Sequence, residues 1–473
     1  MTDTRTQMEL LVVAMMDAGA DVVRRTARAL VTVALFGVCW GAAAQEAPQS
    51  LTLQEALALA LERSPALAAA ESDLRGRQAA LDGQNGRWLP RLTTDWSWRW
   101  QQSLPRSVSI GGGTIVTQRQ RTSTRDVGMT VSQTFWQSGL PEAIDSARQQ
   151  VRASEAGLEN QQRQLLMRVA GTFLTILADR ELVAVADEAV SAAERHLEMV
   201  EARIEAGAAA PADRFPVEAE LAAARLESVT ATNAVWQAVV ELRSLLALPP
   251  DALPLLRGAL EERRAEGELR AWIDEGLSQR QDLRAQRHSV RVAELNVSQA
   301  EIDAGLSLSF QGQADYGRYS GTTGESWWLG AGASFPLHDR QARAGVDQAE
   351  ASLESARQRL AELELAVAQE VSQAFYALED AGQRVTAAEA SVAAARANLE
   401  AAQARYAEGA AYIIEVTDAE LSWRRASTSL VQARFDRTVA YYQLLAAAGR
   451  LLTEPEAGEP ATEPADNETV GGP

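Results

Sequence analysis

The chain has 473 residues, a formal net charge of −19 and one cysteine, Cys39. The acidic balance argues against a protein that binds nucleic acid. A single cysteine excludes a disulfide framework and a thiolate metal site. The length alone would suggest two to four domains, but the patterns along the chain predict one body made of two similar halves.

Residues 1–44 are predicted to be a secretory signal peptide. Arginines from Arg24 to Arg28 precede the apolar run Ala29–Trp40, which is too short to span a bilayer, and Ala42–Ala44 offers small residues for cleavage. We expect Cys39 to be removed with this leader and not to carry a lipid, because a valine precedes it.

The mature chain is predicted to contain two structural repeats of the same order: a helix, a β-hairpin, a long helix and a return helix. A tail rich in proline and glutamate, expected to be disordered, follows them. The predicted bounds are residues 45–260 for the first repeat with its hairpin at 89–137, 261–452 for the second with its hairpin at 304–337, and 453–473 for the tail.

Each predicted hairpin alternates apolar and polar residues with a period of two. In Leu92–Trp100, leucine and tryptophans alternate with Thr93, Asp95 and Ser97. Amphipathic aromatic residues gather at membrane interfaces, so these strands favour a membrane sheet over the alternative, a soluble hairpin with one buried face. The predicted interface aromatics are Trp96, Trp98, Trp100, Trp136, Trp327 and Trp328.

Four strands cannot close a membrane barrel, because about eight is the smallest number that does. Open strand edges in lipid would leave backbone groups unpaired. Several copies are therefore expected to share one barrel. Two copies would give eight strands, and three would give twelve with a more open lumen.

The long helix of the second half carries a heptad seam from Val346 to Tyr406, where apolar or small residues recur at steps of three and four. Subtracting 202 from each position gives a similar seam from Ile144 to Ile204. Two helices with one shared register indicate an internal duplication. The turns obey the same shift, with Gly207 matching Gly409 and Asp213 matching Glu415.

These features together resemble the TolC family of outer-membrane efflux proteins. The resemblance covers nearly all of the mature chain and is carried by four segments in order: Leu51–Leu57, Trp88–Leu92, Arg203–Asp213 and Ala404–Ala419. It implies a mainly α fold with a membrane β-barrel: a homotrimer with a twelve-stranded barrel, four strands from each chain, that continues into a long coiled-coil α-helical barrel in the periplasm. Pro336–Arg340 resembles the heavy-metal efflux branch, although His338 stands where that branch usually has phenylalanine.

The resemblance also implies a periplasmic aperture, closed at rest, at the turns of the long helices. Its residues here are Glu415 and Asp418, which would form an acidic ring, with Tyr406, Gly409, Asp213 and Gly207. Glu415 departs from the aspartate that is common in the family, and Ala411 replaces a basic or polar residue. The alternative is that both acids are solvated helix N-terminal residues, which the helix dipole favours.

The resemblance implies an outer-membrane channel of a tripartite efflux pump in a Gram-negative bacterium. Its expected partners are further copies of the chain, outer-membrane lipid, a periplasmic adaptor and an inner-membrane RND or ABC pump. The alternatives are a type I protein secretion channel and a structural periplasmic coiled-coil protein.

The sequence contains no phosphate loop or nucleotide fingerprint, so we expect no enzyme activity and no cofactor. The histidines His196, His288 and His338 are far apart in the sequence. We expect them to be solvated and predict no metal site.

Overall fold

The computed structural model describes residues 51–103, 107–110, 113–116, 120–251, 255–260, 264–319 and 322–450. The predicted signal peptide, with Cys39, and the predicted tail 453–473 lie outside the described residues. So does most of the glycine-rich turn predicted between the first two strands.

The described residues are mostly helical. The helices are α2 (Leu53–Arg63), α3 (Pro65–Asn85), η1 (Gly86–Trp88), α4 (Leu140–Glu205), η2 (Pro211–Asp213), α5 (Arg214–Leu245), α6 (Leu269–Gln279), α7 (Gln281–Ala304), α8 (Arg340–Ala407) and α9 (Ile413–Ala447). Among the residues described, none of the helices combines the length and the apolar character needed to cross a membrane.

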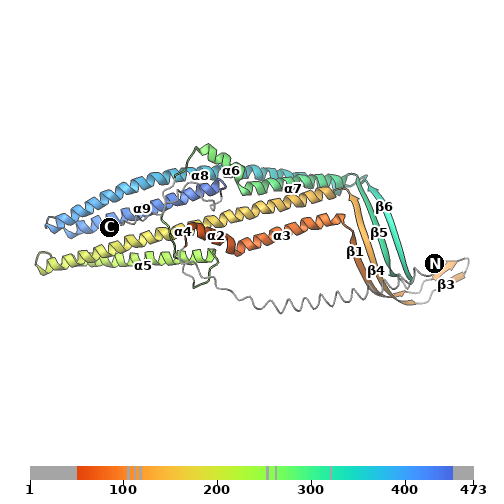
Figure 1. Ribbon diagram of the computed structural model, residues 1–473, viewed down its shortest axis with the longest axis horizontal. Coiled ribbons are helices and arrows are strands. Elements are labelled where there is room, and N and C mark those ends of the chain that lie inside the picture. Colours follow the sequence, from red (N-terminus) through yellow and green to blue (C-terminus); the bar gives the residue numbers. More distant parts are fainter. Residues whose placement is uncertain are drawn as a thin grey trace, which may run out of the picture. The chain divides into compact units, whose positions relative to one another are not determined.

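Two long helical hairpins, α4–α5 and α8–α9, run side by side, and their turns lie at the same end (Figure 1). The shorter helices α3 and α7 pack along α4 toward the other end, where the strands begin. With 66 residues, α4 is about 100 Å long at 1.5 Å per residue. The predicted fold class, long helices with four main strands, is confirmed.

The two long helices bury different amounts of surface. The residues of α8 that are buried all lie on the predicted heptad seam: Val367, Val371, Ala374, Leu378, Ala381, Val385, Ala402 and Tyr406. In contrast, α4 buries a wider stripe, because it packs against α3, α5, α7 and α9. The first-half helix is therefore central within one chain, and α8 keeps one face exposed.

The four long strands form a single antiparallel sheet in the order β1-β4-β5-β6. The two predicted hairpins are joined because β4 pairs with β5, with Val127 opposite Arg318. A separate short hairpin, which the sequence analysis did not anticipate, pairs Ile110 of β2 with Gly113 of β3. The strand bounds are β1 (Arg91–Ser103), β2 (Ser107–Ile110), β3 (Gly113–Val116), β4 (Gln120–Gln137), β5 (Ser307–Tyr319) and β6 (Thr322–Ser334).

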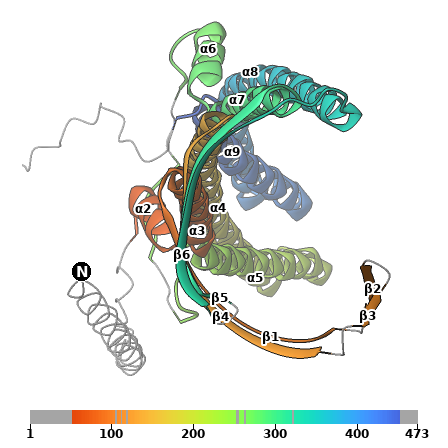
Figure 2. The same ribbon diagram turned by 90° about the vertical axis from the view of Figure 1, so that its right-hand side faces the viewer.

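The sheet is curved (Figure 2) and its two faces differ in character. One face exposes large apolar side chains from several strands, among them Trp96, Val127 and Trp327. The opposite face is largely polar: Thr130 on β4 donates a hydrogen bond of 2.7 Å to Asp315 on β5. The register places Trp328 on this polar face, opposite Gln313. Of the predicted interface aromatics, Trp96, Trp98, Trp100 and Trp327 are more than 60% exposed, Trp136 and Trp328 less so.

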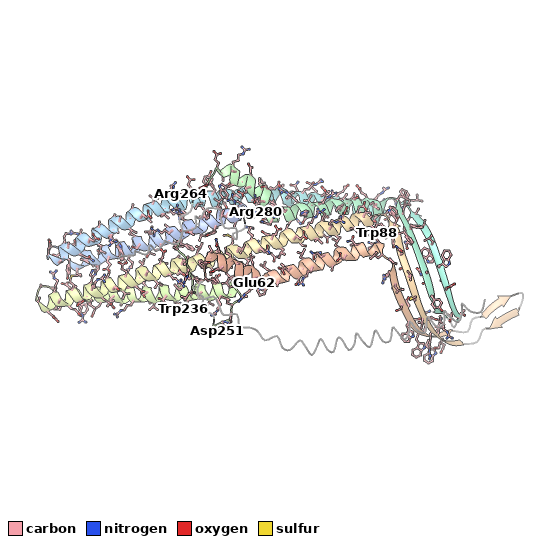
Figure 3. All side chains as sticks on the ribbon, in the orientation of Figure 1. Glu62, Trp88, Trp236, Asp251, Arg264 and Arg280 are labelled. Atoms are coloured by element: carbon pink, nitrogen blue, oxygen red, sulfur yellow. The ribbon has the colours of Figure 1, made fainter. Side chains whose placement is uncertain are left out.

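Two buried arginines cap the C-terminal end of helix α9, which lies in the middle of the helical body. Arg163 of α4 donates a hydrogen bond to the carbonyl oxygen of Ala446, and Arg280 donates one to the carbonyl oxygen of Ala447. Arg280 lies at the junction of α6 and α7 (Figure 3). Arg280 also forms ion pairs with Asp282 and Glu370. Because the last carbonyls of a helix have no partner within it, these cations satisfy them and complement the dipole.

The two return helices end in the same way but with different residues. Gly449 follows α9 with φ of 85°, and Ala247 stands 202 positions earlier, after α5, with φ of 50°. This left-handed conformation suits glycine and strains an L-residue by about 1–2 kcal/mol. A Cβ at position 449 would also lie 3.0 Å from the backbone nitrogen of Arg280.

We therefore predict that Gly449→Ala lowers the free energy of unfolding by about 1–2 kcal/mol or more, and that Ala247→Gly raises it slightly. Thermal unfolding of the purified protein in detergent, followed by circular dichroism, measures both. Equal effects of the two substitutions would contradict this assignment of strain.

Candidate functional site

The ends of the two long hairpins share one backbone design. Gly207 and Gly409 adopt φ of 70° and 77°. The amide N–H of the next residue reaches back into the last helical turn: Ala208 donates to the Arg203 carbonyl and Ala410 to the Arg405 carbonyl, both at 2.8 Å. This is the Schellman arrangement, which needs a left-handed residue after the helix and explains both glycines.

The acids Asp213 and Glu415 have the same local role in the two hairpins. Asp213 Oδ2 accepts a hydrogen bond of 3.1 Å from the amide N–H of Ala210. Glu415 Oε1 accepts one of 3.4 Å from the amide N–H of Tyr412. Each carboxylate therefore caps the start of the return helix, where the dipole also favours a negative charge.

The two predicted aperture acids lie on the first two turns of α9. Asp418 is exposed, and the carboxylate of Glu415 lies 3.5 Å from the guanidinium of Arg405 on α8, with both side chains about half exposed. Such an exposed ion pair is weak. The negative charge of this turn therefore stays available to cations in solution.

Tyr406 is buried, with 5% of its surface exposed, and it joins the two hairpins. The guanidinium of Arg203, on α4, lies 4.6 Å from the centre of its ring and donates a hydrogen bond to its backbone carbonyl. Burial raises the pKa of the Tyr406 hydroxyl, which finds no hydrogen-bond partner among the described residues. The contact between hairpins thus depends on Arg203 and the ring, and not on the hydroxyl.

An apolar cluster surrounds this contact. Val200 of α4, Val217 of α5, Tyr406 of α8 and Val416 of α9 are buried together, so all four long helices contribute. The structure therefore brings Tyr406, Gly409, Glu415 and Asp418 to one end of the molecule with Gly207 and Asp213.

About three helical turns from these glycines lies a buried polar cluster that the sequence analysis missed. The side chains of His196 on α4 and Glu420 on α9 are 4% and 3% exposed, and His196 Nδ1 lies 2.8 Å from Glu420 Oε2. Glu220 on α5 completes the cluster. The expectation that His196 is solvated is wrong, because α4 packs against α9 as well as α5.

The surroundings of Glu220 disfavour the charged form of its carboxyl group. Burial raises the pKa of Glu220 to about 7, and the negative charge of Glu420 contributes in the same direction. The sequence did contain a signal that these glutamates are buried. Glu220 interrupts an apolar stripe formed by Val217, Leu221 and Ala224, and Glu420 lies one helical turn after the buried Val416.

A family model described as "Outer membrane efflux protein" matches residues 56–248 and 272–450. The chain belongs to the outer membrane efflux protein family. It is similar to the outer membrane protein TolC of Vibrio cholerae, with 26% identity over 336 residues, which cover 68% of this chain and 76% of TolC. It is also similar to OpmQ of Pseudomonas putida, a pyoverdine export outer membrane protein, with 27% identity and coverage of 69% and 71%.

The fold is that of solved outer-membrane channels. A structure of CusC superimposes with a TM-score of 0.74, covering 88% of this chain and 96% of that one, at 18% identity. The chain is thus an outer-membrane channel of a tripartite efflux pump, and its family consists of channels and not of enzymes.

Two substitutions at the Arg203–Tyr406 contact distinguish the role of the Tyr406 hydroxyl from that of its ring and backbone. We expect Tyr406→Phe to leave the hairpin ends intact, because the hydroxyl makes no hydrogen bond to any described residue. We expect Arg203→Ala to loosen them by about 1–3 kcal/mol, since a charged hydrogen bond is lost. Faster cleavage by trypsin after Arg405 reports the loosening. Faster cleavage in Tyr406→Phe than in Arg203→Ala would contradict the prediction.

Proposed function

We propose that three copies of this chain form a passive exit duct. The sheets close together into one pore wall in the outer membrane, and the helical hairpins continue it into the periplasm. The turns at Gly207 and Gly409 surround a gated aperture that faces an adaptor and an inner-membrane pump of the RND or ABC class.

The observation that carries this proposal is the pair of sheet edges. Within the described strands, β1 pairs only with β4, and β6 pairs only with β5. Each edge is 13 residues long. Because the sheet has an even number of antiparallel strands, joining β6 of one copy to β1 of the next keeps every pairing antiparallel. Three copies supply twelve strands, which leave a more open lumen than eight.

The helices support the same assembly through the internal repeat. Within the chain, α4 packs against α9, and the repeat shift of 202 residues supports a corresponding contact of α8 with α5. That second interface requires a neighbouring copy. Its surface on α5 is an exposed apolar stripe at heptad spacing: Phe215, Leu226, Val229, Trp236 and Val240.

The repeat equivalents of two members of this stripe are already buried within the chain. Val229 and Trp236 correspond to Val431 and Thr438, which are 7% and 4% exposed on α9. Because the counterpart of this stripe on α9 is buried within the chain, we expect the exposed stripe on α5 to be covered as well. The helix that would cover it is α8 of another copy.

The internal contact between His196 and Glu420 provides a cross-linking test. Its repeat equivalents are Asn398 on α8 and Glu218 on α5, which we expect to face each other between copies. We predict that Asn398→Cys combined with Glu218→Cys, treated with a short bismaleimide, gives covalent dimers and trimers and no larger species.

Each single-cysteine variant is the control and should yield no series of cross-linked dimers and trimers. Absence of cross-linking in the double variant, or a series that ends at two copies, would overturn the trimer. The mature chain otherwise offers no cysteine if Cys39 leaves with the leader.

Three copies of Glu415 and Asp418 would place six carboxylates around the aperture, a ring that binds cations. We predict that Glu415→Gln with Asp418→Asn weakens the block of single-channel conductance by multivalent cations by about tenfold or more, a loss of about 1.4 kcal/mol in binding. Glutamine at 415 can still accept the Tyr412 hydrogen bond, so stability should hardly change.

The matched control is Asp380→Asn, which removes an exposed negative charge from the middle of α8, far along the helix from the turn at Gly409, and should leave the block unchanged. Block that is unchanged in the double variant would remove Glu415 and Asp418 from the aperture. It would leave the trimer proposal untouched, because the cross-linking test does not depend on these acids.

A further inference from the structure

The buried cluster of His196, Glu220 and Glu420 has the composition and geometry of a metal-binding site. One ligand atom from each of the three side chains lies within 4.8 Å of the other two. Oε1 of Glu420 and Oε2 of Glu220 are buried and have no hydrogen-bond partner among the described residues. Buried carboxylate oxygens of this kind are rare without a cation, a proton or water to satisfy them.

Apart from the imidazole of His196, which lies 2.8 Å from Glu420, the protein supplies little positive charge to this cluster. The neighbouring cation is Arg424, but its guanidinium lies 3.5 Å from the carboxylate of Glu227, and Asp418 adds a further negative charge near Glu220. One helical turn from the three cluster residues, on the same three helices, are the buried Val200, Val217 and Val416. Two ionised carboxylates in such surroundings repel each other strongly unless a cation lies between them or one of them takes up a proton.

The geometry points to a divalent metal site formed by His196 Nδ1 and carboxylate oxygens of Glu220 and Glu420. We infer that it binds a borderline transition-metal ion of the Zn²⁺ or Co²⁺ type. One imidazole with two carboxylates suits these ions, whereas Ca²⁺ and Mg²⁺ prefer oxygen ligands alone and Cu⁺ prefers sulfur.

The fourth long helix supplies the support that a metal-bound histidine needs. Gln403 on α8 lies 3.4 Å from His196 Nε2 through its side-chain amide. When Nδ1 binds a metal, Nε2 carries the proton, and an amide rotated by 180° presents its oxygen to accept that hydrogen bond. Gln403 is therefore placed to fix the orientation of the imidazole in both states.

The site is specific to the interface within one chain. The equivalent positions in the other repeat are Asn398, Ser422 and Glu218, which lack the histidine and the second carboxylate. The three ligand residues therefore occur together at one of the two equivalent sets of positions and not at the other. An interface between copies would not carry the same site.

A bound ion would connect α4 and α5 of one hairpin to α9 of the other. It would stabilise the state in which the hairpins are packed and oppose their separation near the aperture. This consequence for gating rests on the proposed function. The metal site itself does not.

Metal binding to the full-length mature protein in detergent, freed of metal with a chelator, tests the proposal directly. Co²⁺ is the first probe, because its visible absorption bands report imidazole and carboxylate ligation, and Zn²⁺ is the second, with bound metal counted by elemental analysis. We expect one ion per chain. Glu220→Gln and Glu420→Gln should each weaken binding by about tenfold or more.

Glu218→Gln is the matched control, since Glu218 is the repeat equivalent of Glu420 and lies half exposed beside Arg214 on the same helix as Glu220. It should bind Co²⁺ as the wild type does. If Glu420→Gln fails to fold, Glu220→Gln carries the test, because Glu220 is only partly buried. Absence of a bound ion, or binding unchanged in both variants, would overturn the site and leave a buried carboxyl pair that shares a proton.

Discussion

The constraint on which the rest of this structure depends is the hydrogen bonding of backbone groups at the edges of its sheet. A bilayer core offers no water, so every unpaired N–H or C=O in it costs several kcal/mol. One chain of this outer-membrane channel presents two such edges, β1 and β6. The proposed trimer would pair these edges, and the exposed tryptophans, the apolar stripe on α5 and the open face of α8 are surfaces that further copies and lipid are suited to cover.

The internal duplication would allow one kind of helix contact to be used twice in the proposed trimer. Within the chain, α4 packs against α9, and the same packing repeated between chains would close the helical part without a new interface design. The residues at the equivalent positions of the two repeats have nevertheless diverged. Only the internal contact carries His196 and its two glutamates, whereas the equivalent positions hold Asn398, Ser422 and Glu218. A modification confined to one of two similar interfaces can adjust how firmly the hairpins hold together without altering how copies assemble.

Periodicity predicted most of the fold because the burial of these elements is one-sided. The seam from Val346 to Tyr406 contains every buried residue of α8 in the described structure, and the alternation in Leu92–Trp100 predicted β1. It failed for α4, which contacts several helices and buries positions beside its seam, His196 among them. It also could not foresee Arg203 over Tyr406, since that contact joins residues 203 positions apart. The roles of Glu415 and Asp418 at an aperture stay a prediction, because one chain cannot display a ring.

Native mass spectrometry of the protein extracted from outer membranes in detergent tests the central claim most directly. The account predicts a particle with the mass of three mature chains that needs detergent to stay in solution. A monomer that is stable without detergent, with Trp96 and Trp327 in water, would contradict it.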